Sequence, residues 1–309
     1  MDNVRLKNAD SISIPYIVFN DVSDEYRAFL LYDETLMVSK SNDLLSWSDF
    51  EFLSIDVKGY SLSHVSFFSG KYYFIIKKEG KIQVLSSSDL VSFKKISPYY
   101  PVEFPSDTCG ENLYFDKDGK MWLSYCQNGN ISIYPFFDNG KYTGANVLFM
   151  GRTILRFDSL SNAQIINSEN GKLYIIVNDD ILNSVECIKS DSGTLLGPWF
   201  KSSSSLFKSG NGLYIKGRNG SSYLAARENE KSPLVIFELE ETEEKYAILN
   251  EITGDFKNTI HNKLVKQIHK PHWAIDLRTI FRFPDMNKRV DRAAIANSLK
   301  NFLRKKIFK

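Results

Sequence analysis

Short runs of β-branched and aromatic residues recur along the chain, and each run is bounded by Gly, Asn, Asp or Ser. Runs of this length and composition are typical of strands on a pleated, half-buried sheet. Most are followed by a small turn and a second, strongly aromatic run. The pattern predicts an all-β fold with first strands of successive modules at residues 16–20, 65–68, 112–115, 163–166 and 213–216.

A sequence repeat organises these strands. The stretch SNDLLSW at residues 41–47 returns as SSDLVSF at residues 87–93, and aromatic runs recur about every fifty residues. This period is expected for one four-stranded propeller blade. Modules at about 5–50, 55–100, 105–150, 155–205 and 206–250 therefore predict a five-bladed β-propeller over residues 1–252.

The repeated stretch also predicts local structure at the edge of a blade. Its Asp and Ser are expected to accept backbone N–H groups in a tight turn. Its aromatic residue, Trp47 or Phe93, is expected to fill the gap to the next blade. These roles are structural.

Residues 253–309 form a basic C-terminal extension. From residue 257 onward there are 14 Lys and Arg against 3 Asp and Glu, whereas the first 256 residues hold 25 against 34. Apolar residues at helical spacing over 291–309 predict a short amphipathic helix with a basic face. Such a helix could bind an anionic membrane surface, bind a protein partner, or pack against the propeller. Nucleic acid is disfavoured as a partner because the first 256 residues are acidic.

Composition excludes several other classes of protein. Cys109, Cys126 and Cys187 are too few for a disulfide framework, so we expect them to be reduced and buried. No secretory signal and no apolar run long enough for a membrane span is present, which favours a cytoplasmic protein, membrane-peripheral through its tail, or a virion-borne one. The histidines of the tail fit no common zinc spacing, and no phosphate-binding loop occurs, so neither a metal nor a cofactor is expected.

The chain resembles the five-bladed propeller glycoside hydrolases, which include arabinanases, xylosidases, invertases and levansucrases. The likeness covers about residues 10–250. The residues that carry it are the edges at 41–47 and 87–93, the Gly-Lys-x-Tyr/Trp strands and the LGPW stretch at 196–199. The resemblance implies a site at the starts of the inner strands, where one carboxylate acts as base or nucleophile, another as acid, and a third tunes the acid.

At the matching positions this sequence departs from the pattern. Ile14 stands where the resemblance places the base, Gly110 where it places the tuning Asp, and Asn162 where it places the acid. An amide can hold a sugar hydroxyl but cannot protonate a leaving group. Because a slip of one residue moves a side chain to the other face of a strand, Asp10, Asp107 and Glu111 remain the candidate catalytic residues, with Asp158 as a further possibility.

Two readings of function follow from these substitutions. The first is a carbohydrate-binding or carbohydrate-processing protein that lacks the standard acid/base pair, a pseudoenzyme acting on surface-polysaccharide precursors. The second is an active glycosidase with displaced carboxylates. A phage or adhesin module that recognises glycans is a third, from another class. For sugar contacts we single out the following residues: His64, Asn162, Gln164 and Asn211.

Overall fold

The computed structural model describes residues 14–96, 108–137, 152–156, 160–195, 197–229 and 232–252. The chain divides into two units, Met1–Ile268 and His269–Lys309, and every described residue belongs to the first. The basic extension and its predicted helix therefore lie outside the described residues. Within the part of the chain that is described, no helical segment has the length and hydrophobicity that crossing a membrane requires.

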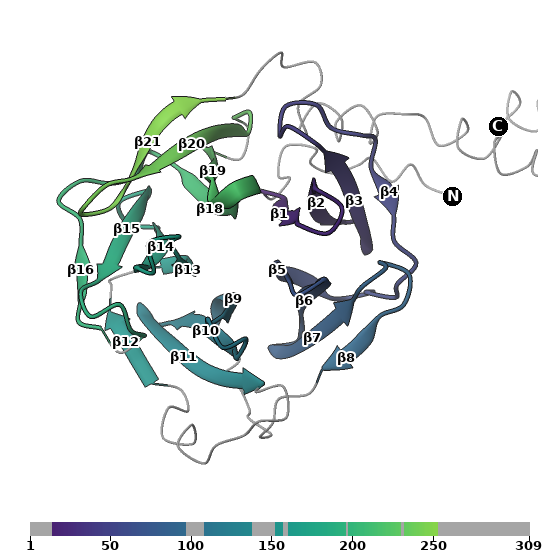
Figure 1. Cartoon of the computed structure of the whole chain (residues 1–309). Coiled ribbons are helices and arrows are strands. Elements are labelled where there is room, and N and C mark those ends of the chain that lie inside the picture. Colours follow the sequence, from purple (N-terminus) through teal and green to yellow (C-terminus); the bar gives the residue numbers. More distant parts are fainter. Residues whose placement is uncertain are drawn as a thin grey trace, which may run out of the picture. The chain divides into compact units, whose positions relative to one another are not determined.

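Five antiparallel sheets surround a common axis (Figure 1). This confirms the prediction of an all-β, five-bladed propeller. The first blade contains β1 (Tyr16–Asn20), β2 (Glu25–Tyr32), β3 (Thr35–Ser41) and β4 (Glu51–Phe52). The second blade contains β5 (Ser61–Phe68), β6 (Lys71–Lys78), β7 (Lys81–Ser87) and β8 (Lys94–Ile96).

The remaining blades follow the same order from the axis outward. The third contains β9 (Cys109–Phe115), β10 (Met121–Gln127), β11 (Asn130–Phe137) and β12 (Arg152–Arg156). The fourth contains β13 (Leu160–Asn167), β14 (Leu173–Asp179), β15 (Ser184–Ser190), β16 (Trp199–Lys201) and β17 (Phe207–Lys208). The fifth contains β18 (Asn211–Lys216), β19 (Ser222–Arg227), β20 (Val235–Glu241) and β21 (Tyr246–Glu251), with a short 3₁₀ turn, η3 (Arg218–Gly220).

Two predicted module limits need correction. Strand β12 pairs with β11 and so closes the third blade, beyond its predicted end at residue 150. Strand β17 pairs with the start of β15, so residues 207–208 belong to the fourth blade rather than the fifth. The limits were wrong because an outer strand that follows a long connection carries no repeat signature of its own.

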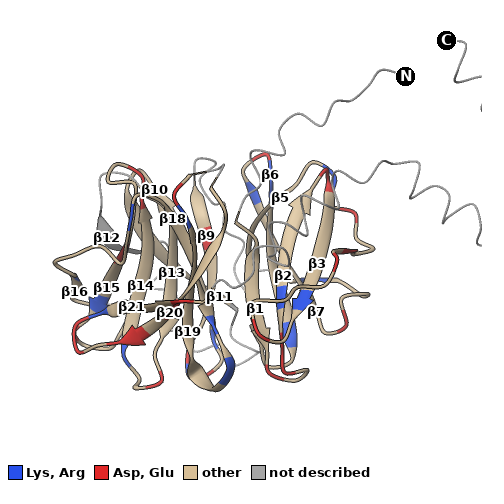
Figure 2. Ribbon diagram, turned by 90° about the horizontal axis from the view of Figure 1, so that it is seen from above, with Lys and Arg blue, Asp and Glu red and all other residues tan. Residues whose placement is uncertain are grey.

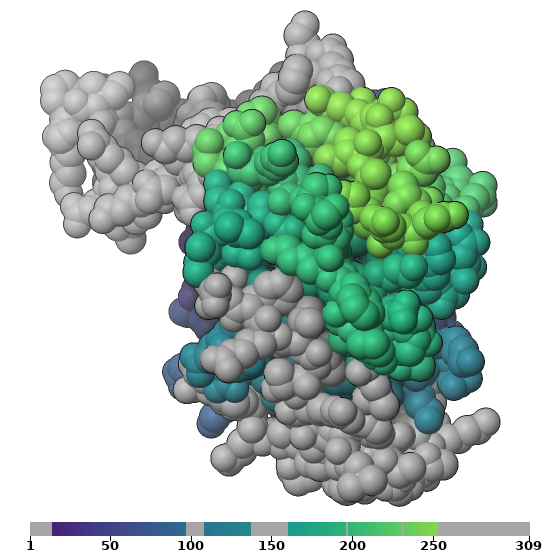
Figure 3. Space-filling model, turned by 90° about the vertical axis from the view of Figure 1, so that its left-hand side faces the viewer, coloured from purple at the N-terminus to yellow at the C-terminus, as the bar shows by residue number. Residues whose placement is uncertain are grey.

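The apolar core is divided among the interfaces between blades. Five clusters of buried side chains occur among the described residues, and each combines residues from two neighbouring blades. Seen from the side, the inner strands run along the axis between these clusters (Figure 2). On one side of the molecule the outer strands of blades four and five form a continuous surface (Figure 3).

The repeated edge stretch folds in the same way in both copies. The carboxylate of Asp43 accepts the backbone N–H groups of Leu45 and Ser46 at 2.9 and 2.8 Å. The carboxylate of Asp89 accepts those of Val91 and Ser92 at the same two distances. These bonds confirm the predicted turn, and they hold the pKa of both carboxyls below the usual value.

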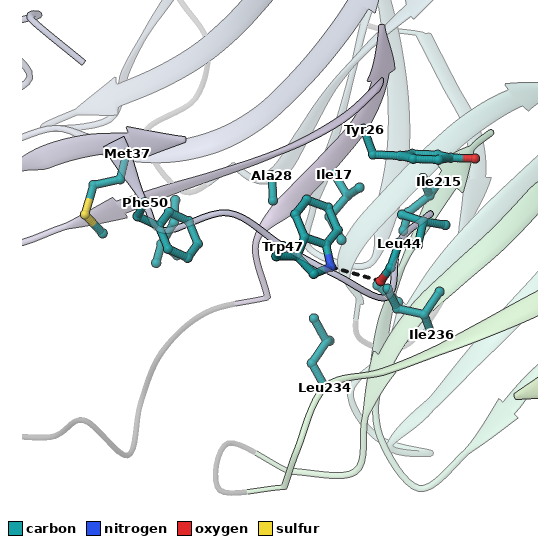
Figure 4. Close-up of a cluster of buried hydrophobic side chains, with 12 residues drawn as sticks. Ile17, Tyr26, Ala28, Met37, Leu44, Trp47, Phe50, Ile215, Leu234 and Ile236 are labelled. Carbon is teal, nitrogen blue, oxygen red and sulfur yellow. Dashed lines mark hydrogen bonds between the residues drawn. The ribbon is translucent and has the colours of Figure 1, made fainter. Parts of the chain in front are cut away.

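Trp47 packs on a different neighbour from the one predicted. It is buried in a cluster with Leu234 and Ile236 of blade five, and its indole N–H donates to the Leu44 carbonyl at 2.9 Å (Figure 4). Phe93 likewise packs in the cluster between blades one and two. Each aromatic residue thus packs against the preceding blade. The reason is that the edge turn brings the chain back across its own sheet before the chain continues to the next blade.

Candidate functional site

The candidate site lies at the end of the propeller where the inner strands begin. Tyr16 starts β1, His64 lies in the first half of β5, Glu111 is the third residue of β9, and Asn162 is the third residue of β13. Side-chain contacts between neighbouring blades connect these residues, as described below. The inner strands are therefore aligned so that their N-terminal ends share one face of the molecule (Figure 1).

Glu111 is the buried acid of this site. It is 2% exposed, and its Oε1 atom lies 2.8 Å from the ammonium of Lys77, which reaches across from β6 of the preceding blade. The hydroxyl of Thr108 donates to the same oxygen at 2.9 Å. The ion pair and the hydrogen bond both engage Oε1 of Glu111, and the ion pair connects blades two and three.

Gly110 lies where the backbones of two neighbouring blades come very close together. Its φ is +58°, and a Cβ there would lie 2.6 Å from the Ser161 carbonyl oxygen and 2.7 Å from the Cα of Asn162. Such distances are well inside van der Waals contact, and positive φ favours glycine. The backbones of β9 and β13 approach so closely here that a side chain at residue 110 would push the two blades apart.

An amide pair joins β9 to β13. The Nδ2 atom of Asn112 lies 2.7 Å from the Oδ1 atom of Asn162, and it also contacts the carbonyls of Gly110 and Ala163 at 2.7 and 2.9 Å. The Oδ1 atom of Asn112 is buried without a hydrogen-bond partner. This amide oxygen is therefore a buried acceptor whose hydrogen-bonding capacity is not satisfied by the protein.

His64 and Tyr16 form the apolar side of the site. Their rings meet edge to face with centroids 5.8 Å apart. Burial lowers the pKa of His64 to about 3, although a hydrogen bond with the Leu113 backbone acts in the opposite direction, and its Nδ1 atom has no partner. Burial and, secondarily, the charge of Glu111 raise the pKa of Tyr16. At neutral pH both rings are therefore uncharged.

The other two predicted sugar contacts differ in their surroundings. Gln164 is buried, and its side-chain amide bonds to the backbone of β18. Its Oε1 atom accepts the Tyr214 N–H at 2.7 Å, and its Nε2 atom donates to the Tyr214 carbonyl at 3.4 Å. This amide joins blades four and five. Asn211 is exposed at the first residue of β18. The candidates Asp10, Asp107 and Asp158 lie outside the described residues.

Several residues of the site were not anticipated from the sequence. In the sequence, Lys77 is one of two lysines at the end of a strand, where exposure to solvent is expected. Nothing in its spacing predicts a contact with the next blade. Tyr16 directly follows Ile14 and Pro15. That pair was notable in the sequence only because Ile14 stands where the resemblance places a carboxylate. Asp180, in the turn after β14, affects Cys109 and Cys126 electrostatically, as Glu111 does. No signal in the sequence places Lys77 with Glu111.

A hollow of about 420 Å³ opens between blades one and two on the same face. Tyr16 and Tyr60 line it together with Asp33 and Glu34 from the β2–β3 turn. A second hollow, of about 440 Å³, lies between blades three and four at the opposite ends of the strands, where Tyr114, Trp122 and Asn167 line it. Within the described residues, no cluster of three His, Cys, Asp or Glu side chains is arranged to hold a metal ion.

Comparison with known proteins finds similar folds but no similar sequences. No sequence-family profile matches the chain, and no characterised protein matches it by sequence. Among solved structures, an endo-arabinase from Bacteroides thetaiotaomicron is similar with a TM-score of 0.60 and 18% identity, over 76% of this chain and 96% of that one. A thermostable family-43 glycoside hydrolase gives 0.59 and 15% identity, over 81% and 96%.

A third similar structure contains a bound saccharide. An exo-β-1,3-galactanase from Phanerochaete chrysosporium, solved with β-1,3-galactotriose, gives a TM-score of 0.57 at 12% identity, over 78% of this chain and 63% of that one. At such identities the likeness concerns the fold. The chain is therefore an all-β, five-bladed propeller whose architecture resembles that of the family-43 glycoside hydrolases.

Proposed function

We propose that this protein binds a saccharide at the N-terminal ends of the inner strands and does not hydrolyse it by paired-carboxylate catalysis. The observation that carries the proposal is the amide pair of Asn112 and Asn162, held at 2.7 Å in the position where the resemblance places the acid. Gly110, where no side chain fits, and Glu111, held by Lys77, add to it. An enzyme that protonates a leaving group needs a carboxylic acid in that place.

The chemistry of the site suits a neutral, polyhydroxylated ligand. Tyr16 and Tyr60 offer ring faces on which the apolar face of a sugar stacks. The unpartnered Oδ1 atom of Asn112 and the Nδ1 atom of His64 are buried acceptors that sugar hydroxyls satisfy. Several of the similar structures contain saccharides or their analogues, including galactose and galactodeoxynojirimycin.

Calorimetry with β-1,3-galactotriose, xylotriose and arabinotriose tests binding. At least one of them should bind to the wild-type protein, and Asn162→Ala should weaken that binding about tenfold, the equivalent of about 1.4 kcal/mol, because Asn112 loses its anchor. Asn250→Ala, at an exposed position of β21, is the matched control and should bind normally. No binding of any oligosaccharide at millimolar concentration would contradict the proposal.

Turnover of aryl glycosides separates this proposal from an active glycosidase with displaced carboxylates. We expect no turnover above that of a buffer control. Should turnover appear and disappear in Asp10→Asn, Asp107→Asn or Glu111→Gln, the glycosidase alternative holds and the proposal fails. A crystal soaked with the best oligosaccharide locates the site, and a sugar found in the hollow lined by Tyr114 and Trp122 would contradict the position we assign.

A further inference from the structure

Two cysteines face each other across neighbouring strands beside the candidate site. Cys109 is the first residue of β9, and Cys126 on β10 is its direct partner in the antiparallel ladder. Opposed residues in such a ladder have Cα atoms about 4.5–5.5 Å apart. A disulfide requires a Cα separation of about 4.4–6.8 Å. The strand register, which shifts at an irregularity between Ser124 and Cys126, thus places the two cysteines opposite each other, as a disulfide between neighbouring strands requires.

The two thiols have different environments. Cys109 is exposed, contrary to the prediction that all three cysteines are buried, because it lies at the rim of the sheet where β9 begins. Cys126 is 1% exposed. The sulfur of Cys109 also lies 3.3 Å from the Leu160 carbonyl oxygen of the next blade. An oxidant in solution can reach Cys109 but not Cys126.

The contact between the two thiols favours a reactive Cys109, whereas burial and the nearby carboxylates oppose it. A hydrogen bond from the Cys126 thiol lowers the pKa of Cys109, with a smaller contribution from the Lys77 ammonium. Burial and the carboxylates of Glu111 and Asp180 act against this. The same hydrogen bond and burial raise the pKa of Cys126. The exposed sulfur is thus the better nucleophile, and the buried thiol keeps its proton.

We propose that Cys109 and Cys126 form a reversible disulfide when a hydroperoxide reaches the protein, with Cys109 attacking and Cys126 resolving. The Cys109 thiolate attacks the terminal oxygen of the hydroperoxide, so that an S–O bond forms and the O–O bond breaks. Hydroxide leaves when the oxidant is hydrogen peroxide, and an alkoxide leaves when it is an organic hydroperoxide; either anion is then protonated. The Cys126 sulfur then gives up its proton and attacks the Cys109 sulfur. The S–S bond forms, the S–O bond breaks and water leaves.

The bond would join β9 to β10 immediately before Gly110, Glu111 and Asn112. It would therefore fix the start of the strand that carries the buried acid and half of the amide pair. The proposal does not depend on saccharide binding, because it rests on the register and exposure of the two cysteines alone. Its test uses thiol chemistry and leaves the proposed function aside.

Treatment of the wild-type protein with hydrogen peroxide, followed by thiol titration and intact mass measurement, gives the first test. We expect the three free thiols to fall to one, with the loss of two hydrogen atoms and no added oxygen. Peptide mapping should find a Cys109–Cys126 crosslink and an unmodified Cys187, which is buried on β15 of another blade. Dithiothreitol should restore all three thiols.

Variants assign the two roles. In Cys126→Ser, peroxide should convert Cys109 to a sulfenic acid that dimedone traps. In Cys109→Ser, Cys126 should be protected from peroxide. The Cys187→Ser variant should oxidise as the wild type does. Cys109 oxidised to a sulfinic acid beside a free Cys126, or joined to a second molecule, would overturn the proposal. Peptide mapping of the wild type decides this even where a variant fails to fold.

Discussion

At the scale of single residues, the Glu111–Lys77 pair spans two blades and is largely withdrawn from water. The side chain of Glu111 is 3% exposed and that of Lys77 is 17% exposed. Both charges have lost hydration, and each is stabilised by the other and by Thr108. Removal of one partner leaves an uncompensated buried charge, which costs more than the pair contributes.

We therefore expect Lys77→Met to destabilise the protein by about 3 kcal/mol, at the lower end for a broken buried pair because Lys77 keeps some contact with water. Chemical denaturation measures the change. The double variant Lys77→Met with Glu111→Gln should recover part of the loss, since no buried charge remains. Lys81→Met, at an exposed position of β7, is the control and should change stability by less than about 0.5 kcal/mol.

His64 makes stability depend on pH in a defined direction. Its pKa is about 3 in the folded protein and 6.5 ordinarily, so the unfolded chain takes up a proton first as the pH falls. The stabilisation is complete above pH 6.5 and is lost towards pH 3, at about 1.4 kcal/mol per pH unit. His64→Phe, which packs on Tyr16 but cannot titrate, should lose less stability over this range. Equal slopes for variant and wild type below pH 6 would disprove the assignment.

The sequence predicted that Glu111, His64 and Asn162 lie near the starts of inner strands, and the structure has them there, because the repeat indicates where each inner strand begins. It did not identify Lys77, whose role depends on how one blade is rotated against the next. That rotation follows from side-chain packing between blades, and no local pattern encodes it. The close approach of β9 and β13 at Gly110 is of the same kind, since a glycine in a sequence gives no indication of which backbone lies beside it.

At the scale of elements, the polar and the apolar residues of the edge turn stabilise different parts of the fold. Asp43 closes the turn through backbone N–H groups, and Trp47 then enters the interface with blade five. The repeat predicted the turn because its hydrogen bonds are local. It did not predict the neighbour of Trp47, because the direction in which the chain leaves a sheet depends on the whole ring.

Truncation of Trp47 tests how much its packing between blades one and five contributes to stability. Trp47 is 4% exposed, so Trp47→Ala should cost about 3–5 kcal/mol, the range for a large buried aromatic side chain. Trp47→Phe should cost less, since it keeps most of the packing and loses only the N–H bond to Leu44. Val91→Ala, in the second edge turn at a 71% exposed position, serves as the control in thermal unfolding. A loss of under 1 kcal/mol for Trp47→Ala would contradict the packing described.

At the scale of the whole molecule, each blade consists of strands that are consecutive in the chain. Composition and period together were sufficient to predict the number of blades, because every module buries its faces against its neighbours in the same way. Strands without the repeat signature, β12 and β17, were assigned to the wrong side of a boundary. Long-range pairing decides where such strands belong.

Four of the five joints between blades lie between consecutive parts of the chain, while the joint between the last blade and the first brings together described residues far apart in the sequence. Among the described residues, no strand from one end of the chain completes a sheet formed by the other end. The Trp47 cluster spans this joint, as do the contacts of Arg218 with Asp24 and the Tyr26 hydroxyl. In the described part of the chain, side-chain and backbone contacts alone hold these two blades together, so we expect thermal motion to separate the blades at this joint before it separates them at any other.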